Sequence, residues 1–72
     1  MIEHSDVTGR TFNSEDAVYF RNLLQSSFYI AHNATILDVF TDSEGKMVVV
    51  FPREEHNKLL KLWMDNKKNN TD

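Results

Sequence analysis

Residues 35–51 read TILDVFTDSEGKMVVVF, and this stretch decides the fold. β-Branched and aromatic side chains fill both of its ends, a composition that is typical of strands. Between the two ends, residues 42–45 (DSEG) favour a turn, and Gly45 can adopt the positive φ that such a turn needs. The stretch therefore predicts a β-hairpin. Pro52 ends its second strand, because proline lacks the N–H of a ladder hydrogen bond.

Residues 12–32 precede the hairpin and carry the pattern of an amphipathic helix. Asn13 is a good N-cap, because its side-chain oxygen can accept a free N–H of the first turn, and acidic residues follow it near the positive end of the helix dipole. We therefore predict a helix over residues 12–32. The alternative is a helix that ends near Gln25, followed by a third strand over residues 27–32. The predicted inward face carries apolar residues at steps of three and four: Ala17, Phe20, Leu24, Phe28 and Ala31.

A second helix is predicted over residues 53–66, directly after the hairpin. Pro52 suits the start of a helix. Trp63 lies on the apolar face of this helix, and we expect it to be a core residue. The fold class is then α+β, with the order helix–β-hairpin–helix (αββα). We expect three parts: a flexible arm or an edge strand over residues 1–12, a single domain over residues 13–68 and a frayed tail over residues 69–72.

Composition and charge narrow the class of function. The chain has 72 residues, no cysteine and a net charge of −3. Residues 1–45 carry a net charge of −5, whereas residues 46–71 carry +3. An acidic chain is poorly suited to bind nucleic acid directly, and its acidic half favours a basic protein partner. Because it has no disulfide framework, no signal peptide and no apolar run long enough to span a bilayer, we expect a soluble cytoplasmic protein without membrane contact.

The sequence contains no pattern typical of an active site or a metal site. Serines are present, but no nucleophile motif places one of them beside a base. His4, His32 and His56 are far apart, none has a second histidine at i+3 or i+4, and thiolate ligands are absent. We therefore expect no enzyme activity, no catalytic residue, no metal and no cofactor.

Partner binding is the function that the pattern favours, because the predicted hairpin is apolar on both faces. If the sheet has only two strands, one face of residues 47–51 and both sheet edges meet water. A partner protein, a second copy of the chain or the arm over residues 1–12 could cover that face. Tyr29 is expected to be exposed on the polar side of the first helix. The expected partner-binding residues are Tyr29, Asn22, Gln25 and His32 on that helix, and Asp42 and Glu44 at the acidic hairpin tip.

The chain resembles the small modulator-of-repression (antirepressor) proteins of temperate phages that infect lactic acid bacteria. The likeness lies in its size, its acidity, its lack of cysteine and the segments NSEDAVYFRNLLQSSFYIAHN (13–33) and VVVFPREEHNKLLKLW (48–63). The resemblance implies a regulator of transcription in the lysis–lysogeny switch, which acts in the cytoplasm of the host cell. It implies that the chain binds the helix-turn-helix domain of a repressor and blocks its access to operator DNA.

Two other functions stay open at this point. The chain could be a structural homodimer or an assembly subunit that pairs its hairpins, or it could bind nucleic acid directly. The partner, the oligomeric state and the binding surface are left open as well. A direct nucleic-acid binder would use the bases of the second half: Arg53, Lys58, Lys61, Lys67 and Lys68.

Overall fold

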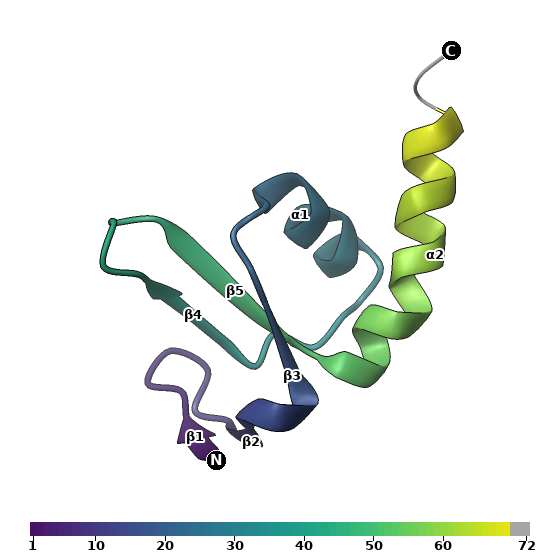
Figure 1. Ribbon diagram of the computed structural model, residues 1–72. Coiled ribbons are helices and arrows are strands. Elements are labelled where there is room, and N and C mark those ends of the chain that lie inside the picture. The colour runs from purple at the N-terminus through teal and green to yellow at the C-terminus, as the bar shows by residue number, and fades with distance from the viewer. Residues whose placement is uncertain (70–72) are drawn as a thin grey trace.

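The structure, a computed structural model, describes residues 1–69 and is arranged around the strand β5 (Met47–Pro52) (Figure 1). β5 is the central strand of an antiparallel sheet with the order β3-β5-β4, and the first two strands form a separate two-stranded sheet. The fold class is therefore α+β. The other elements are β1 (Ile2–His4), β2 (Thr11–Asn13), the 3-10 turn η1 (Ser14–Asp16), β3 (Ala17–Phe20), α1 (Leu23–Ala31), β4 (Asp38–Thr41) and α2 (Arg53–Asn69).

The hairpin predicted from residues 35–51 is present as β4 and β5. Val39 lies opposite Val49 and Thr41 opposite Met47 in an antiparallel register. The turn forms as its residues predict, because the Asp42 side chain accepts the backbone N–H groups of Glu44 and Lys46, and Gly45 has a φ of 78°. The first strand is shorter than expected, however, since it begins at Asp38. Pro52 is the last residue of β5, as predicted.

The single helix predicted over residues 12–32 is wrong in its first half. Ala17–Phe20 forms β3, which pairs with β5, and the helix α1 begins only at Leu23. Its N-cap is Asn22, whose side chain accepts the N–H groups of Leu24 and Gln25, whereas Asn13 caps only the short turn η1. The physical reason is tertiary: the free edge of β5 offers a hydrogen-bonding partner to a short run with β-branched and aromatic residues. The order αββα is therefore not confirmed.

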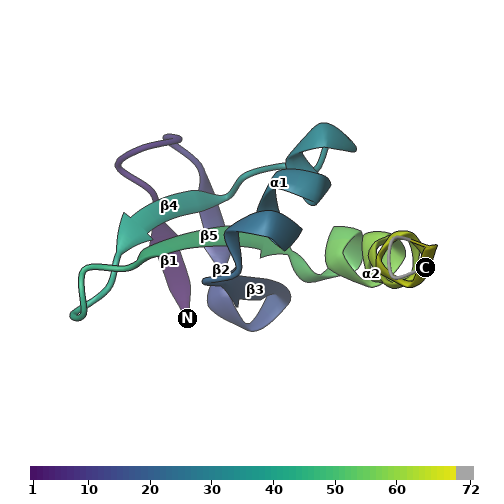
Figure 2. The same cartoon turned by 90° about the horizontal axis from the view of Figure 1, so that it is seen from above.

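The alternative of a third strand over residues 27–32 is wrong, because α1 continues through this segment to Ala31. The second helix starts at Arg53, as predicted, and runs to Asn69, three residues further than expected. Apart from Asn69, the predicted tail lies outside the described residues. Seen along its axis, α2 lies beyond one end of the three-stranded sheet (Figure 2).

α1 covers one face of the three-stranded sheet, and α2 packs against the same core from the end of the sheet (Figure 2). Residues directly opposite each other share a face, so Val18, Val49 and Phe51 lie on the side that packs against the helices. Tyr29 from α1 belongs to the same buried cluster, and Trp63 from α2 packs against it, which agrees with the prediction that Trp63 is a core residue. This face holds the main core of the protein.

The N-terminal residues cover the other face. Phe12 of β2 is buried against Ala17 and Val50. Two side-chain hydrogen bonds connect the loop after β1 to β4 and the residue before it. Ser5 donates to the Asp38 carboxylate, and Thr8 donates to the carbonyl oxygen of Leu37. β1 and β2 run across the direction of β4 and β5 (Figure 2), and in Figure 1 they lie on the opposite side of the sheet from α1.

Both faces of β5 are thus closed within the chain. Val48 and Val50 are buried, although the hairpin alone would leave one face of β5 open to water. Of the three possible covers, a partner, a second copy and the N-terminal arm, it is the N-terminal arm that lies there. The apolar character of β5 is therefore no argument for a partner.

Candidate functional site

Tyr29 is fully buried, so the prediction that it is exposed for a partner is wrong. Its ring packs against Phe20 and Phe51, with centroid distances of 5.4 and 5.3 Å. Its hydroxyl oxygen lies 3.0 Å from Gln25 Nε2, which donates to it, and 2.9 Å from His56 Nδ1. Burial raises the pKa of Tyr29, and the hydrogen bond from Gln25 partly opposes this rise. Tyr29 is a core residue that joins α1 to α2.

The orientation of α1 explains the error. Because the helix begins at Leu23, Ser26 and Tyr29 are its two buried residues, and they lie one turn apart toward the core. The aliphatic residues Leu23, Leu24 and Ile30 point outward, with Leu24 77% exposed. The prediction that Leu24 and Ala31 lie on the inward face of the helix is therefore wrong, since both residues are exposed.

The remaining helix residues of the predicted set have local structural roles. Asn22 is the N-cap, and Gln25 contacts Tyr29 as described above. His32 follows the last turn, where its ring stacks on Phe28 at 4.2 Å and its Nδ1 lies 3.0 Å from the Phe28 carbonyl oxygen. Asn22 and His32 cap opposite ends of α1, so the structure does not gather the four residues into one exposed surface.

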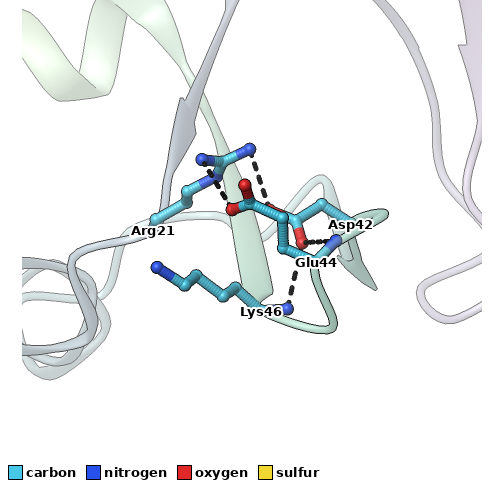
Figure 3. A network of polar contacts seen from close by, with 4 residues as sticks. All are labelled: Arg21, Asp42, Glu44 and Lys46. Atoms are coloured by element: carbon cyan, nitrogen blue, oxygen red, sulfur yellow. Dashed lines mark hydrogen bonds and ion pairs between the residues drawn. The ribbon is translucent and has the colours of Figure 1, made fainter.

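The hairpin tip carries a network of ion pairs and hydrogen bonds (Figure 3). Arg21 pairs with Asp42 at 2.8 Å and approaches Glu44 at 3.8 Å, and the side chain of Lys46 lies beside them. The backbone N–H of Lys46 is the main cause that lowers the pKa of Asp42, while the N–H of Glu44 and the charge of Arg21 act in the same direction. Arg21 thus pairs with Asp42 and more loosely with Glu44, whose side chain is 63% exposed, whereas Lys46 binds Asp42 only through its backbone N–H. A partner contact at Asp42 and Glu44 stays a prediction.

A different group of residues meets on the sheet face beneath the N-terminal strands. It lines a hollow of about 220 Å³ between β1, β2, β3 and β4. Two of its residues are aromatic and partly exposed, with ring centroids 6.3 Å apart in an edge arrangement. Two others are acidic. We call this the acidic–aromatic hollow, and its lining residues are Glu3, Phe12, Tyr19, Asp38 and Phe40.

The strand register brings these residues together. Tyr19 and Asp38 lie on either side of Val50, and Phe40 lies opposite Val48, so all three project from the same face of the sheet. The pairing of β1 with β2 places Glu3 opposite Phe12. No sequence signal could have found this set while residues 17–20 were assigned to a helix. Once Ala17–Phe20 is known to be a strand, the alternation of side chains along a strand does indicate the set, because residues 17 and 19, like residues 38 and 40, then share a face.

The carboxylate of Asp38 is held in a fixed orientation. Its Oδ1 accepts the hydroxyl of Ser5 at 2.6 Å and the backbone N–H of Val39 at 2.8 Å, and Ser5 is itself fully buried. Burial raises the pKa of Tyr19, and the negative charges of Glu3 and Asp38 raise it further. Within residues 1–67, neither Glu3 nor Asp38 forms an ion pair with a basic side chain.

A larger hollow of about 480 Å³ lies at the start of α2, beside Asp16, Pro52 and Asn57. The guanidinium of Arg53 in this region donates to the carbonyl oxygens of Ala17 and Glu15. Arg53 therefore ties α2 to β3. In the part of the chain that the structure describes, no three histidine or acidic side chains form a group that could hold a metal ion.

Comparison with protein-family models, with curated proteins and with solved structures finds no match to this chain. Among residues 1–69, neither helix combines the length and the apolar character needed to cross a bilayer.

Proposed function

We propose that this chain is a small protein-binding regulator that engages a basic DNA-binding domain and blocks its access to DNA. The observation that carries the proposal is the acidic–aromatic hollow together with the net negative charge of residues 1–45. The resemblance to antirepressors adds the kind of partner, the helix-turn-helix domain of a phage repressor, and the place of action, the cytoplasm of the host cell.

The charge of the N-terminal part supports a basic partner. Residues 1–17 contain four acidic side chains and one arginine, and one of these acids, Glu3, lines the hollow together with Asp38. A helix-turn-helix domain presents basic side chains to the phosphate backbone of DNA. Opposite charges on two surfaces accelerate their association and favour this partner over acidic ones. A protein that covers the basic face competes directly with DNA for it.

Apolar groups beside the charges support a protein rather than an ion as the partner. Tyr19 and Phe40 are 44% and 40% exposed in the hollow, and Ile2 and Val7 are exposed in the N-terminal strands and their loop. Protein interfaces combine such aromatic anchors with a polar rim. The proposed interface therefore has an aromatic centre with carboxylates around it.

A competition experiment tests this function. The genome is first searched for a helix-turn-helix repressor encoded beside this chain. That repressor is bound to labelled operator DNA, and fluorescence anisotropy follows the DNA as the chain is added. We expect the anisotropy to fall to the value of free DNA. The variant Lys61→Gln serves as a control, because Lys61 is exposed on α2, away from the hollow. A chain that binds the repressor on DNA without lowering its affinity for the operator would contradict the proposal.

A homodimer is the second candidate, and the outward face of α1 favours it. Leu23, Leu24 and Ile30 leave an apolar surface on this helix that no other described segment covers fully. Exposed apolar surface of this kind marks interaction sites in soluble proteins. Sedimentation velocity at high concentration decides this point, because a monomer there would exclude the dimer. The variant Leu24→Glu should abolish any dimer that is seen.

A further inference from the structure

We infer that the acidic–aromatic hollow is the receptor for the guanidinium group of one arginine side chain of the partner. This inference rests on the proposed function, because the arginine belongs to the basic partner surface. It goes further, since it names the group that enters the hollow and the residues that hold it: Glu3, Asp38, Tyr19 and Phe40.

The size of the hollow fits the end of a side chain. Its volume of about 220 Å³ is below the range of about 300–1,000 Å³ that is usual for pockets of drug-sized ligands. The fold also closes it on one side, because Phe12 at its base is buried against Ala17 and Val50. A flat, short group can therefore enter the hollow beside the two exposed rings, which contact each other in an edge arrangement.

The charge of the hollow selects a cation. Glu3 and Asp38 both line it, and within residues 1–67 no basic side chain neutralises either of them. Their charges reach the phenol of Tyr19, which is why they contribute to the raised pKa of that group. An anionic ligand would meet repulsion from both carboxylates, whereas a cation would be stabilised by them.

The aromatic rings favour guanidinium over ammonium. The rings of Tyr19 and Phe40 lie at an interplanar angle of 66°. A planar group can therefore stack flat on one ring while its edge points toward the other. Guanidinium stacks on aromatic faces and also donates two parallel hydrogen bonds to a carboxylate, which a lysine ammonium cannot do. Asp38 can accept one such hydrogen bond through Oδ2, because Ser5 and Val39 occupy its Oδ1 and fix its orientation. Within residues 1–67, the carboxylate of Glu3 accepts no side-chain hydrogen bond and forms no ion pair, so both of its oxygens can accept the parallel pair.

The test is an NMR titration of the full chain with two matched ligands. One is N-acetylarginine methylamide, and the other is the corresponding citrulline compound, which has nearly the same shape but no charge. We expect the arginine compound to shift the amide signals of Tyr19, Asp38 and Phe40 in a saturable way, while the citrulline compound leaves them unchanged. Equal shifts with both ligands, shifts confined to other residues, or no shift at millimolar arginine compound would overturn the inference.

Matched variants separate the contributions of charge and ring. Glu3→Gln should weaken binding of the arginine compound about two- to fivefold, as expected for one partly exposed ion pair. Tyr19→Leu should weaken it by a similar factor through the loss of the cation–π contact. The control is Glu15→Gln, which removes the same charge from the exposed turn η1 outside the hollow and should change nothing. Equal affinity in all three variants would contradict the inference.

The same variants distinguish this inference from the proposed function. If the wild-type chain releases the repressor from its operator and both Glu3→Gln and Tyr19→Leu do so equally well, the inference about the hollow is wrong and the proposed function stands. If the wild-type chain does not release the repressor, the proposed function is wrong. In that case the titration alone shows whether the hollow binds the guanidinium group of the arginine compound.

Discussion

The hydroxyl group of Tyr29 holds the two helices together. It is buried between Gln25 of α1 and His56 of α2, and both polar groups approach it within hydrogen-bonding distance. A buried polar group that loses its hydrogen-bond partner still carries the free-energy cost of its desolvation, with no hydrogen bond to offset it. This small network therefore makes the contact between the helices specific, in addition to the packing of the aromatic rings.

The variant Tyr29→Phe keeps the ring and removes only the hydroxyl. We expect it to lower the free energy of unfolding by about 1–2 kcal/mol, because Gln25 and His56 lose a buried partner. Urea denaturation measures the change. The matched variant Tyr19→Phe alters a tyrosine that is 44% exposed, so it should change stability by less than about 0.5 kcal/mol. Equal effects of the two variants would argue against the network.

His56 should make the stability depend on pH. Burial, and then the charge of Arg53, lower its pKa below the usual 6.5, so the unfolded chain binds a proton more readily than the folded one. The stability due to neutral His56 is therefore fully present above pH 6.5 and is lost as the pH falls from there through the folded-state pKa.

Urea denaturation between neutral pH and pH 5 checks this dependence. In His56→Gln, which keeps a polar group beside Tyr29 but does not titrate, the decline below pH 6.5 should be weaker. Asp42 does not interfere, since its lowered pKa makes the stability that it contributes disappear only as the pH falls below 3.8. An unchanged decline in His56→Gln would assign it to another group.

Among the elements, the β4–β5 hairpin and α2 were predictable from the sequence, whereas β3 and the start of α1 were not. The hairpin carries its own turn chemistry at residues 42–45, and α2 starts directly after Pro52. The run AVYF at residues 17–20 has no such local signal. Its apolar residues fit a helix at steps of three and four as well as a strand, and short runs of this kind are ambiguous. Pairing with β5, thirty residues later, decides it.

The candidate site could not be predicted for the same reason. Each residue of the acidic–aromatic hollow is ordinary in its own segment, and only the common pairing of β3 and β4 with β5 brings Tyr19, Asp38 and Phe40 to one face. Tyr29 was misplaced because its position depends on where α1 begins. The predicted inward face was defined partly by Ala17 and Phe20, and both residues lie in β3 rather than on the helix.

A single substitution at the start of α1 distinguishes the two arrangements. Asn22→Ala removes the N-cap, so we expect the free energy of unfolding to fall by about 1 kcal/mol. If residues 12–32 formed one helix, Asn22 would lie in its middle, and alanine, the best helix former, would stabilise it by some tenths of a kcal/mol. Urea denaturation thus gives opposite signs for the two arrangements, and a stabilised variant would contradict β3 and α1 as described.

At the scale of the whole molecule, the N-terminal strands act as a second layer over the sheet. Phe12 anchors this layer, and hydrogen bonds from Ser5 and Thr8 fix the loop between its strands. The layer supplies Glu3 and Phe12 to the hollow, so the cover of the core and the candidate site depend on the same residues.

Phe12→Ala tests this layer. We expect it to lower the free energy of unfolding by about 3 kcal/mol, because a buried aromatic side chain leaves a cavity against Ala17 and Val50. Val7→Ala is the control, since Val7 is exposed in the loop of the same layer and its truncation should cost less than about 0.5 kcal/mol. A mobile arm would instead make both variants harmless.

The strand order β3-β5-β4 also determines when the central sheet can fold during synthesis of the chain. Neither β3 nor β4 has its sheet partner until residues 47–52 have left the ribosome, because both pair with β5 and not with each other. Up to that moment the nascent polypeptide forms no part of the central sheet, and the nine-residue helix α1 lacks the packing that stabilises so short a helix. Once β5 has emerged, both β3 and β4 can pair with this one strand.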